Sequence, residues 1–221
     1  MIHVATHSEA GGHAQNEDAF AIASHPDDPH SLLCALADGQ GGQAGGGPAA
    51  RLACDIFLEL ASRVPLPRLL APSGWNDVLT QVDRVVADDA VAGFTTLVAW
   101  TLARGHLAGA SCGDSALLVG AQRQAAALTA RQCKYPAVGS GGAVFIPFST
   151  ALVVPWVVLA MSDGVWKYAG WEAVHQAAVG GSDDLIRPLR ERAALSRTGA
   201  LQDDFTLVVL RENGAATRPD A

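Results

Sequence analysis

The chain has 221 residues, a formal net charge of −7 and 49% hydrophobic residues. A chain of this length buries enough apolar surface for one large domain, and we expect residues 1–212 to form it because no linker divides them. The acidic balance and the absence of basic clusters exclude nucleic acid as the main partner. No apolar run reaches about 18 residues, so no membrane span and no membrane partner are expected.

The compartment is predicted from the cysteines and the N-terminal residues. The four cysteines are scattered and form no CxxC pair, which indicates free thiols in a reducing compartment. The first residues lack the charged and apolar regions of a signal peptide. We therefore expect a cytoplasmic monomer, with residues 213–221 as a disordered tail.

The first half of the chain is predicted to contain three strands followed by two helices. The strands are expected over residues 2–8, 19–23 and 31–37, and the second and third of them are expected to pair as a hairpin. After a glycine-rich loop, Pro48 is expected to open an amphipathic helix, and apolar spacing predicts another helix over residues 75–86.

The second half is predicted to be richer in strands. We expect them over residues 94–102, 106–112, 116–120, 125–128, 143–148, 151–161 and 205–210, with Pro155 at an edge or a bulge. Helices are expected over residues 171–179 and after Ser182 as the N-cap. Hairpin-linked strands and paired helices favour an α+β sandwich of antiparallel sheets with helices outside, rather than a βαβ fold.

Three apolar runs each end in a turn that carries an aspartate. The turns are Asp38-Gly39, Gly113-Asp114-Ser115 and Ser162-Asp163-Gly164. A carboxylate at the end of a buried strand is unfavourable unless something pairs with its charge. Each Asp-Gly taken alone favours an ordinary turn over a metal ligand. The repetition of this context is what indicates a site.

Five aspartates share this kind of position, beside an apolar strand. They are Asp18, Asp38, Asp114, Asp163 and Asp203. Gathered carboxylates repel one another unless cations neutralise them, and oxygen ligands without a zinc-like histidine spacing select Mg²⁺ or Mn²⁺. Such a cluster suits two ions about 3.5–4 Å apart, which activate a water for in-line attack on phosphorus.

Six short motifs in order make the sequence resemble the metal-dependent protein phosphatases of type 2C, as a divergent bacterial-type member. The motifs are Asn16-Glu17-Asp18, Ala37-Asp38-Gly39-Gln40-Gly41-Gly42, Gly93-Phe94-Thr95-Thr96, Gly113-Asp114-Ser115, Ser162-Asp163-Gly164-Val165-Trp166 and Asp203-Asp204-Phe205-Thr206. The resemblance implies a four-layer αββα sandwich of two antiparallel sheets flanked by paired helices. It also implies a dinuclear Mn²⁺ or Mg²⁺ centre, whose bridging water hydrolyses phosphoserine and phosphothreonine in a phosphoprotein partner.

The resemblance also implies roles for individual residues. Asp38 bridges two ions and the Gly39 carbonyl binds one of them, while Asp163 and Asp203 hold the first ion. Glu17 or Asp18 serves the second ion, mainly through waters, and Asp114 with Asp163 matches a weaker third site. Asp38 and Asp163 are thereby the residues expected to be essential for catalysis.

Three departures from the family pattern concern the substrate. His13 stands where the family usually has a phosphate-binding arginine, Asp204 replaces its usual asparagine, and the flap segment between residues 130 and 151 is short. Within that segment Arg131, Lys134 and Tyr135 have two interpretations: a replacement for the missing cation or, as the favoured one, solvated loop residues. Two alternatives therefore stay open: a weakly active regulatory module that binds a phosphoprotein or a serine/threonine kinase, and a phosphatase of small phosphate esters.

Overall fold

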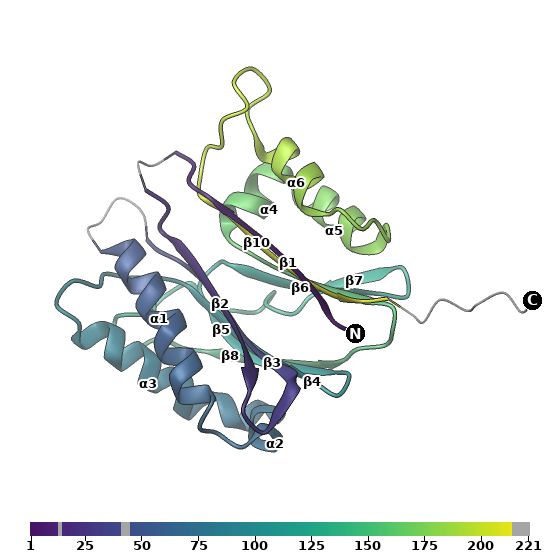
Figure 1. The fold of residues 1–221 in the computed structure, drawn as a ribbon. Coiled ribbons are helices and arrows are strands. Elements are labelled where there is room, and N and C mark those ends of the chain that lie inside the picture. Colours follow the sequence, from purple (N-terminus) through teal and green to yellow (C-terminus); the bar gives the residue numbers. More distant parts are fainter. Residues whose placement is uncertain (13–14, 41–44, 214–221) are drawn as a thin grey trace, which may run out of the picture.

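Two five-stranded antiparallel sheets form the centre of the molecule (Figure 1). The computed structural model describes residues 1–12, 15–40 and 45–213. The first sheet contains, in spatial order, β1 (His3–Glu9), β10 (Phe205–Glu212), β9 (Trp156–Met161), β6 (Ala116–Ala121) and β7 (Gln124–Ala127). The second contains β2 (Asp18–His25), β3 (Asp28–Asp38), β4 (Leu97–Ala103), β5 (His106–Cys112) and β8 (Ile146–Ala151).

Helices cover the outer face of each sheet. The second sheet packs against α1 (Gly46–Ala61), α2 (Leu66–Leu69), a short 3₁₀ turn η1 (Pro72–Gly74) and α3 (Trp75–Asp88). The first sheet packs against α4 (Asp163–Ala169), α5 (Trp171–Val179) and α6 (Ile186–Ala193). The predicted fold, an αββα sandwich with two antiparallel sheets, is confirmed.

The central strands of each sheet are buried on both faces, which explains why they are apolar without alternation. Along β3, Leu33, Ala35 and Ala37 face the helices, whereas Cys34 and Leu36 face the other sheet. Successive side chains of a strand point to opposite faces, so a strand between two apolar layers needs apolar residues at every position. The central strands of these antiparallel sheets therefore have the continuous apolar sequences that are typical of strands in buried parallel sheets.

The expected single strand over residues 151–161 is wrong. The chain leaves β8 at Ala151, passes through Pro155 and re-enters a strand, β9, at Trp156 in the opposite sheet. Pro155 lacks a backbone N–H for the ladder, which suits it to this crossing segment and not to a strand interior. The apolar run thus belongs to two layers of the sandwich.

Two helix starts differ from expectation. Asp163 opens α4 instead of a simple turn, and α6 begins at Ile186 instead of directly after Ser182. This start places Pro188 in the first turn of α6, where its missing N–H costs no helical hydrogen bond. The side chain of Asp184, not that of Ser182, accepts the N–H of Arg187 in that turn.

Most of the predicted tail lies outside the described residues, which end at Asn213. None of the helices within the described ranges combines the length and the apolarity that crossing a membrane requires.

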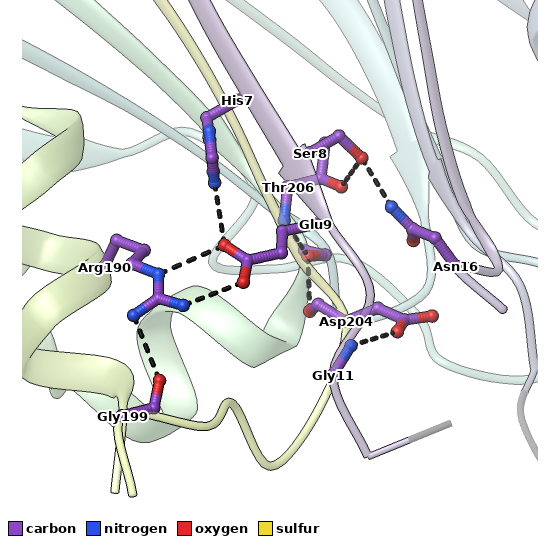
Figure 2. Close-up of polar contacts among 10 residues, drawn as sticks. His7, Ser8, Glu9, Gly11, Asn16, Arg190, Gly199, Asp204 and Thr206 are labelled. Atoms are coloured by element: carbon purple, nitrogen blue, oxygen red, sulfur yellow. Dashed lines mark hydrogen bonds and ion pairs between the residues drawn. The ribbon is translucent and has the colours of Figure 1, made fainter. Parts of the chain in front are cut away.

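Glu9 and Arg190 tie β1 to α6 (Figure 2). The guanidinium donates to both carboxylate oxygens of Glu9, at 3.1 and 2.7 Å, and to the carbonyl oxygen of Gly199 at 3.1 Å. Hydrogen bonds from Arg190, followed by His7, lower the pKa of Glu9 from its ordinary value of 4.5 to about 2. The side chain of Glu9 is 37% exposed, so solvent screening reduces what the pair contributes to stability.

We expect Glu9→Gln to lower the free energy of unfolding at pH 7 by about 0.5–1 kcal/mol. Because the pKa of Glu9 is lower in the folded state, its contribution is present above about pH 4.5 and is lost as the pH falls toward about 2. Urea unfolding of both proteins at a series of pH values would measure this, with Glu191→Gln on the exposed face of α6 as the control. A difference that stays constant down to pH 2 would contradict the expectation.

Candidate metal centre

The acids singled out by the sequence converge on one cavity of about 300 Å³. Six of the residues predicted to bind metal line it: Glu17, Asp38, Gly39, Asp114, Asp163 and Asp203. Asp18 lies beside them, because it opens β2 directly opposite Asp38 in the strand register. His13, the remaining predicted site residue, lies outside the described residues, as do Gly41 and Gly42 of the second motif.

The backbone of Asp38, the last residue of β3, is held by two threonines. Its N–H donates to Oγ1 of Thr96 at 2.9 Å, and its carbonyl oxygen accepts from the N–H of Thr96 and from Oγ1 of Thr95, both at 2.8 Å. At the next position, a Cβ on Gly39 would lie 2.4 Å from the carbonyl carbon of Gly46. Only glycine therefore allows the start of α1 to approach the Asp38 turn so closely.

Asp163 is brought beside Asp203 by the close approach of the start of α4 to the start of β10. Oγ of Ser162 donates to the carbonyl oxygen of Asp204 at 3.3 Å and accepts from the N–H of Thr206 at 3.1 Å. A Cβ on Gly164 would lie 2.0 Å from the carbonyl oxygen of Asp204. In the Ser-Asp-Gly motif, Ser162 and Gly164 thus allow α4 to pack closely against the start of β10, and Asp163 supplies a carboxylate.

The site carries more negative charge than its surroundings compensate. The pKa of Asp18 is raised to about 7, as the net result of burial, the opposing hydroxyls of Thr206 and Ser162, and the charges of Asp204 and Asp163. Burial, followed by repulsion from Asp18 and Asp163, raises the pKa of Asp38 well above its usual range. Neither carboxylate oxygen of Asp18 has a hydrogen-bond partner in the described part of the chain. Buried acids without partners are the arrangement that a bound cation would stabilise.

Two lysines lie against these acids. Nζ of Lys167 is 3.6 Å from a carboxylate oxygen of both Asp163 and Asp203, and Nζ of Lys134 contacts Asp114. Within the described ranges, no group of three or more His, Cys, Asp or Glu residues is arranged so that it could hold an ion as it stands. The carboxylates share one cavity, and an ion would have to draw them closer together.

The chemistry of the donors fits a hard divalent ion. The available ligands are carboxylate oxygens and the carbonyl oxygen of Gly39, which suit Mg²⁺ and Mn²⁺ and do not favour softer metals. The orphaned carboxylate of Asp18, opposite Asp38 in the strand register, adds two further oxygen donors beside the cavity. The residues present therefore match the ions that the sequence motifs imply.

Two features of the cavity wall were not predicted. Lys134 and Tyr135, interpreted from the sequence as solvated loop residues, line the cavity, whereas Arg131 does not. The loop that follows them is bound by Asp83 of α3, whose buried carboxylate accepts the N–H groups of Gly139, Gly141 and Ala143. An acid on the apolar face of the predicted helix was the one available signal for this contact.

Asp204 connects the start of β10 to the segment between β1 and β2, and Figure 2 shows its contact with Gly11 of that segment. Its Oδ1 accepts the N–H of Gly11 at 2.8 Å, and its Oδ2 accepts the N–H of Glu17 at 2.7 Å. Asp204 is only 5% exposed, so both hydrogen bonds are shielded from water. The acid thus fixes two backbone positions, Gly11 and Glu17, in the segment that leads from β1 to β2.

We expect Asp204→Asn to destabilise the metal-free protein by about 1–3 kcal/mol. An amide offers one acceptor oxygen, so one of the two buried N–H groups would face an NH₂ group and lose its partner. Urea unfolding in a chelator would measure the loss, with Asp55→Asn on the exposed face of α1 as the control. Equal stability of wild type and Asp204→Asn would refute this account of the contact.

The fold and the cavity define an αββα sandwich domain with an acid-lined cavity, and the sequence comparison places it in a family. Residues 6–138 match the sequence profile described as Protein phosphatase 2C. This match covers more than half of the chain, and the chain belongs to the protein phosphatase 2C family. A search of curated protein sequences finds no match.

Solved bacterial phosphatases share the fold. The serine/threonine phosphatase PstP/Ppp of Mycobacterium tuberculosis aligns with a TM-score of 0.77 and 20% identity, over 96% of this chain and 99% of its own. The serine/threonine phosphatase Stp1 of Staphylococcus aureus aligns with a TM-score of 0.76 and 18% identity, over 97% of this chain and 96% of its own. PppA, described as a key regulatory component of the T6SS in Pseudomonas aeruginosa, aligns with a TM-score of 0.72 and 21% identity. The alignment covers 95% of this chain and 97% of PppA. At these identities the likeness concerns the fold.

Proposed function

We propose that this chain is a protein serine/threonine phosphatase that depends on two Mn²⁺ or Mg²⁺ ions. The observation that carries the proposal is the convergence of Glu17, Asp38, Asp114, Asp163 and Asp203 on one cavity, with Asp18 buried beside them. A cavity lined by so many acids cannot accept a phosphate ester without cations, since both carry negative charge. Membership of the protein phosphatase 2C family supports the same reaction.

We assign Asp38 to both ions, the Gly39 carbonyl to one of them, and Asp163 with Asp203 to the first. Glu17 or Asp18 would serve the second ion, mainly through waters, and Asp114 with Asp163 would serve a weaker third site. When bound, the ions supply an activated water and neutralise the phosphoryl oxygens for in-line displacement of the ester. The chain's own contribution is to hold these acids on backbone fixed by Thr96, Ser162 and Asp204.

The proposed substrate is a phosphorylated protein in the cytoplasm, with a serine/threonine kinase as the natural opposing partner. The test measures hydrolysis of a phosphothreonine peptide and of p-nitrophenyl phosphate, with and without Mn²⁺. We expect Mn²⁺-dependent turnover that Asp163→Asn abolishes and that the surface control Asp55→Asn retains. Turnover of the aryl ester alone would indicate a small-molecule substrate.

Binding of Mn²⁺ without turnover of either ester would favour the alternative function, a regulatory module that recognises a phosphoprotein or kinase. Isothermal titration with Mn²⁺ distinguishes this case, because binding should be lost in Asp163→Asn whether or not the wild type is active. Failure of the wild type to bind Mn²⁺ would overturn the metal centre itself.

A further inference from the structure

The charge of the cavity leaves a substrate phosphate without enough positive partners. Six carboxylates line it: Glu17, Asp38, Asp114, Asp163, Asp203 and Asp204. Two divalent ions would carry four positive charges and leave an excess of two negative ones. Of the described residues that line the cavity, Lys134 is the one cation. A phosphate dianion entering this site therefore meets one ammonium group.

Lys134 is placed so that it can reach both Asp114 and the interior of the cavity. Its Nζ lies 2.5 Å from Oδ2 of Asp114, and its side chain remains 57% exposed. An ammonium group has three N–H donors, and the contact with Asp114 uses one of them. The remaining donors are available for phosphoryl oxygens, which bind lysine as a point charge.

The backbone around Lys134 is fixed on both sides. Before it, the side-chain amide of Gln132 donates to the carbonyl oxygen of Ser115 at 2.7 Å, and the carbonyl oxygen of Cys133 accepts the N–H of Gly113 at 2.8 Å. After it, Val138 exchanges backbone hydrogen bonds with Thr95, at 3.0 and 3.1 Å. The short flap thus holds Lys134 at the cavity instead of leaving it on a free loop.

The other nearby cations are less suited to this role. Lys167 lies between Asp163 and Asp203, the acids assigned to the first ion, and it does not line the cavity. Arg131 is exposed and also lies off the cavity wall. The family's phosphate-binding arginine is replaced by His13 in the sequence.

We propose that the ammonium group of Lys134 binds the non-bridging oxygens of the substrate's phosphoryl group and takes the place of the missing arginine. This inference rests on the proposed function, since it concerns the substrate of the same site. It makes Lys134 a substrate-binding residue supplied by the flap.

The test measures binding of inorganic phosphate to the full chain in saturating Mg²⁺, by isothermal titration. We expect Lys134→Gln to raise the Kd for phosphate about 10-fold, the usual effect of losing one charge-assisted hydrogen bond. Lys134→Arg should stay within about 3-fold of wild type, and the matched control Arg131→Gln, three residues earlier on the same segment, should leave the Kd unchanged. The exposed side chain of Lys134 makes loss of folding improbable as a cause, and unchanged melting curves would confirm this.

Three results would overturn the inference: no phosphate binding by the wild type, an unchanged or lower Kd in Lys134→Gln, or an equal loss in Arg131→Gln. A lower Kd would mean that Lys134 serves only to neutralise Asp114. Phosphate binding requires no turnover, so a wild type that binds phosphate through Lys134 but hydrolyses no ester would refute the phosphatase proposal alone.

Discussion

Asp38→Asn is expected to reduce Mn²⁺-dependent hydrolysis by roughly 10³-fold or more and, at the same time, to stabilise the metal-free fold by about 1–2 kcal/mol. Turnover falls because Asp38 is the acid assigned to both ions. The free energy of unfolding of the metal-free protein rises because burial and the charges of Asp18 and Asp163 disfavour an ionised Asp38 in the wild type. The amide keeps an oxygen for the weak 3.5 Å contact with the N–H of Asp163, so little packing is lost.

Thermal unfolding with and without Mn²⁺ would test both parts. In wild type, ions at a hundredfold excess over their Kd should stabilise the fold by about 2.7 kcal/mol, and in Asp38→Asn this gain should disappear. The control Asp55→Asn on α1 should keep both the wild-type turnover and the stabilisation by Mn²⁺. A metal-free Asp38→Asn protein less stable than wild type would show that the carboxylate has a structural partner.

Asp83→Ala is expected to destabilise the protein by about 3–4 kcal/mol, because it removes the acceptor of three backbone N–H groups. The acceptor distances are 2.7 Å to Gly139, 3.3 Å to Gly141 and 3.0 Å to Ala143. Asp83 is 1% exposed, so water cannot replace the lost contacts without entering the core beneath α3. Loss of this contact should also loosen the loop that follows Lys134 and Tyr135.

Urea unfolding would measure the loss, and hydrogen exchange would show faster exchange at Gly139 and Ala143. The matched control is Asp88→Ala, an exposed acid at the end of the same helix, which should change stability by less than about 0.5 kcal/mol. Equal effects of the two substitutions would mean that Asp83 stabilises the protein by its negative charge on α3 and not by its hydrogen bonds to the loop.

The local sequence was sufficient to predict the layered fold and most of the acid cluster. Apolar runs mark strands wherever they occur, and an aspartate at the end of such a run stands out without knowledge of its partners. Asp38, Asp114 and Asp163 were identified in this way, and the structure places all three at one cavity. The apolar pattern of a strand and the residue types of a turn depend only on neighbouring residues in the chain. These features can therefore be predicted from the sequence.

Contacts between distant segments were decided by the tertiary structure. Residues 151–161 look like one strand locally, yet the crossing at Pro155 divides them between two sheets. The sequence shows Asp83 as an ordinary acid and Asp204 only as a departure within a motif, because their contacts involve N–H groups 56 and 187 residues away. Lys134 resembles a solvated lysine until the fold places it on the wall of an acidic cavity. By itself, the sequence determined which groups are present and which surfaces must be buried, because those properties follow from residue type and spacing. Only the packed structure decided which acid receives a backbone N–H, a lysine or neither, because these pairings depend on distances between segments that meet only in the folded chain.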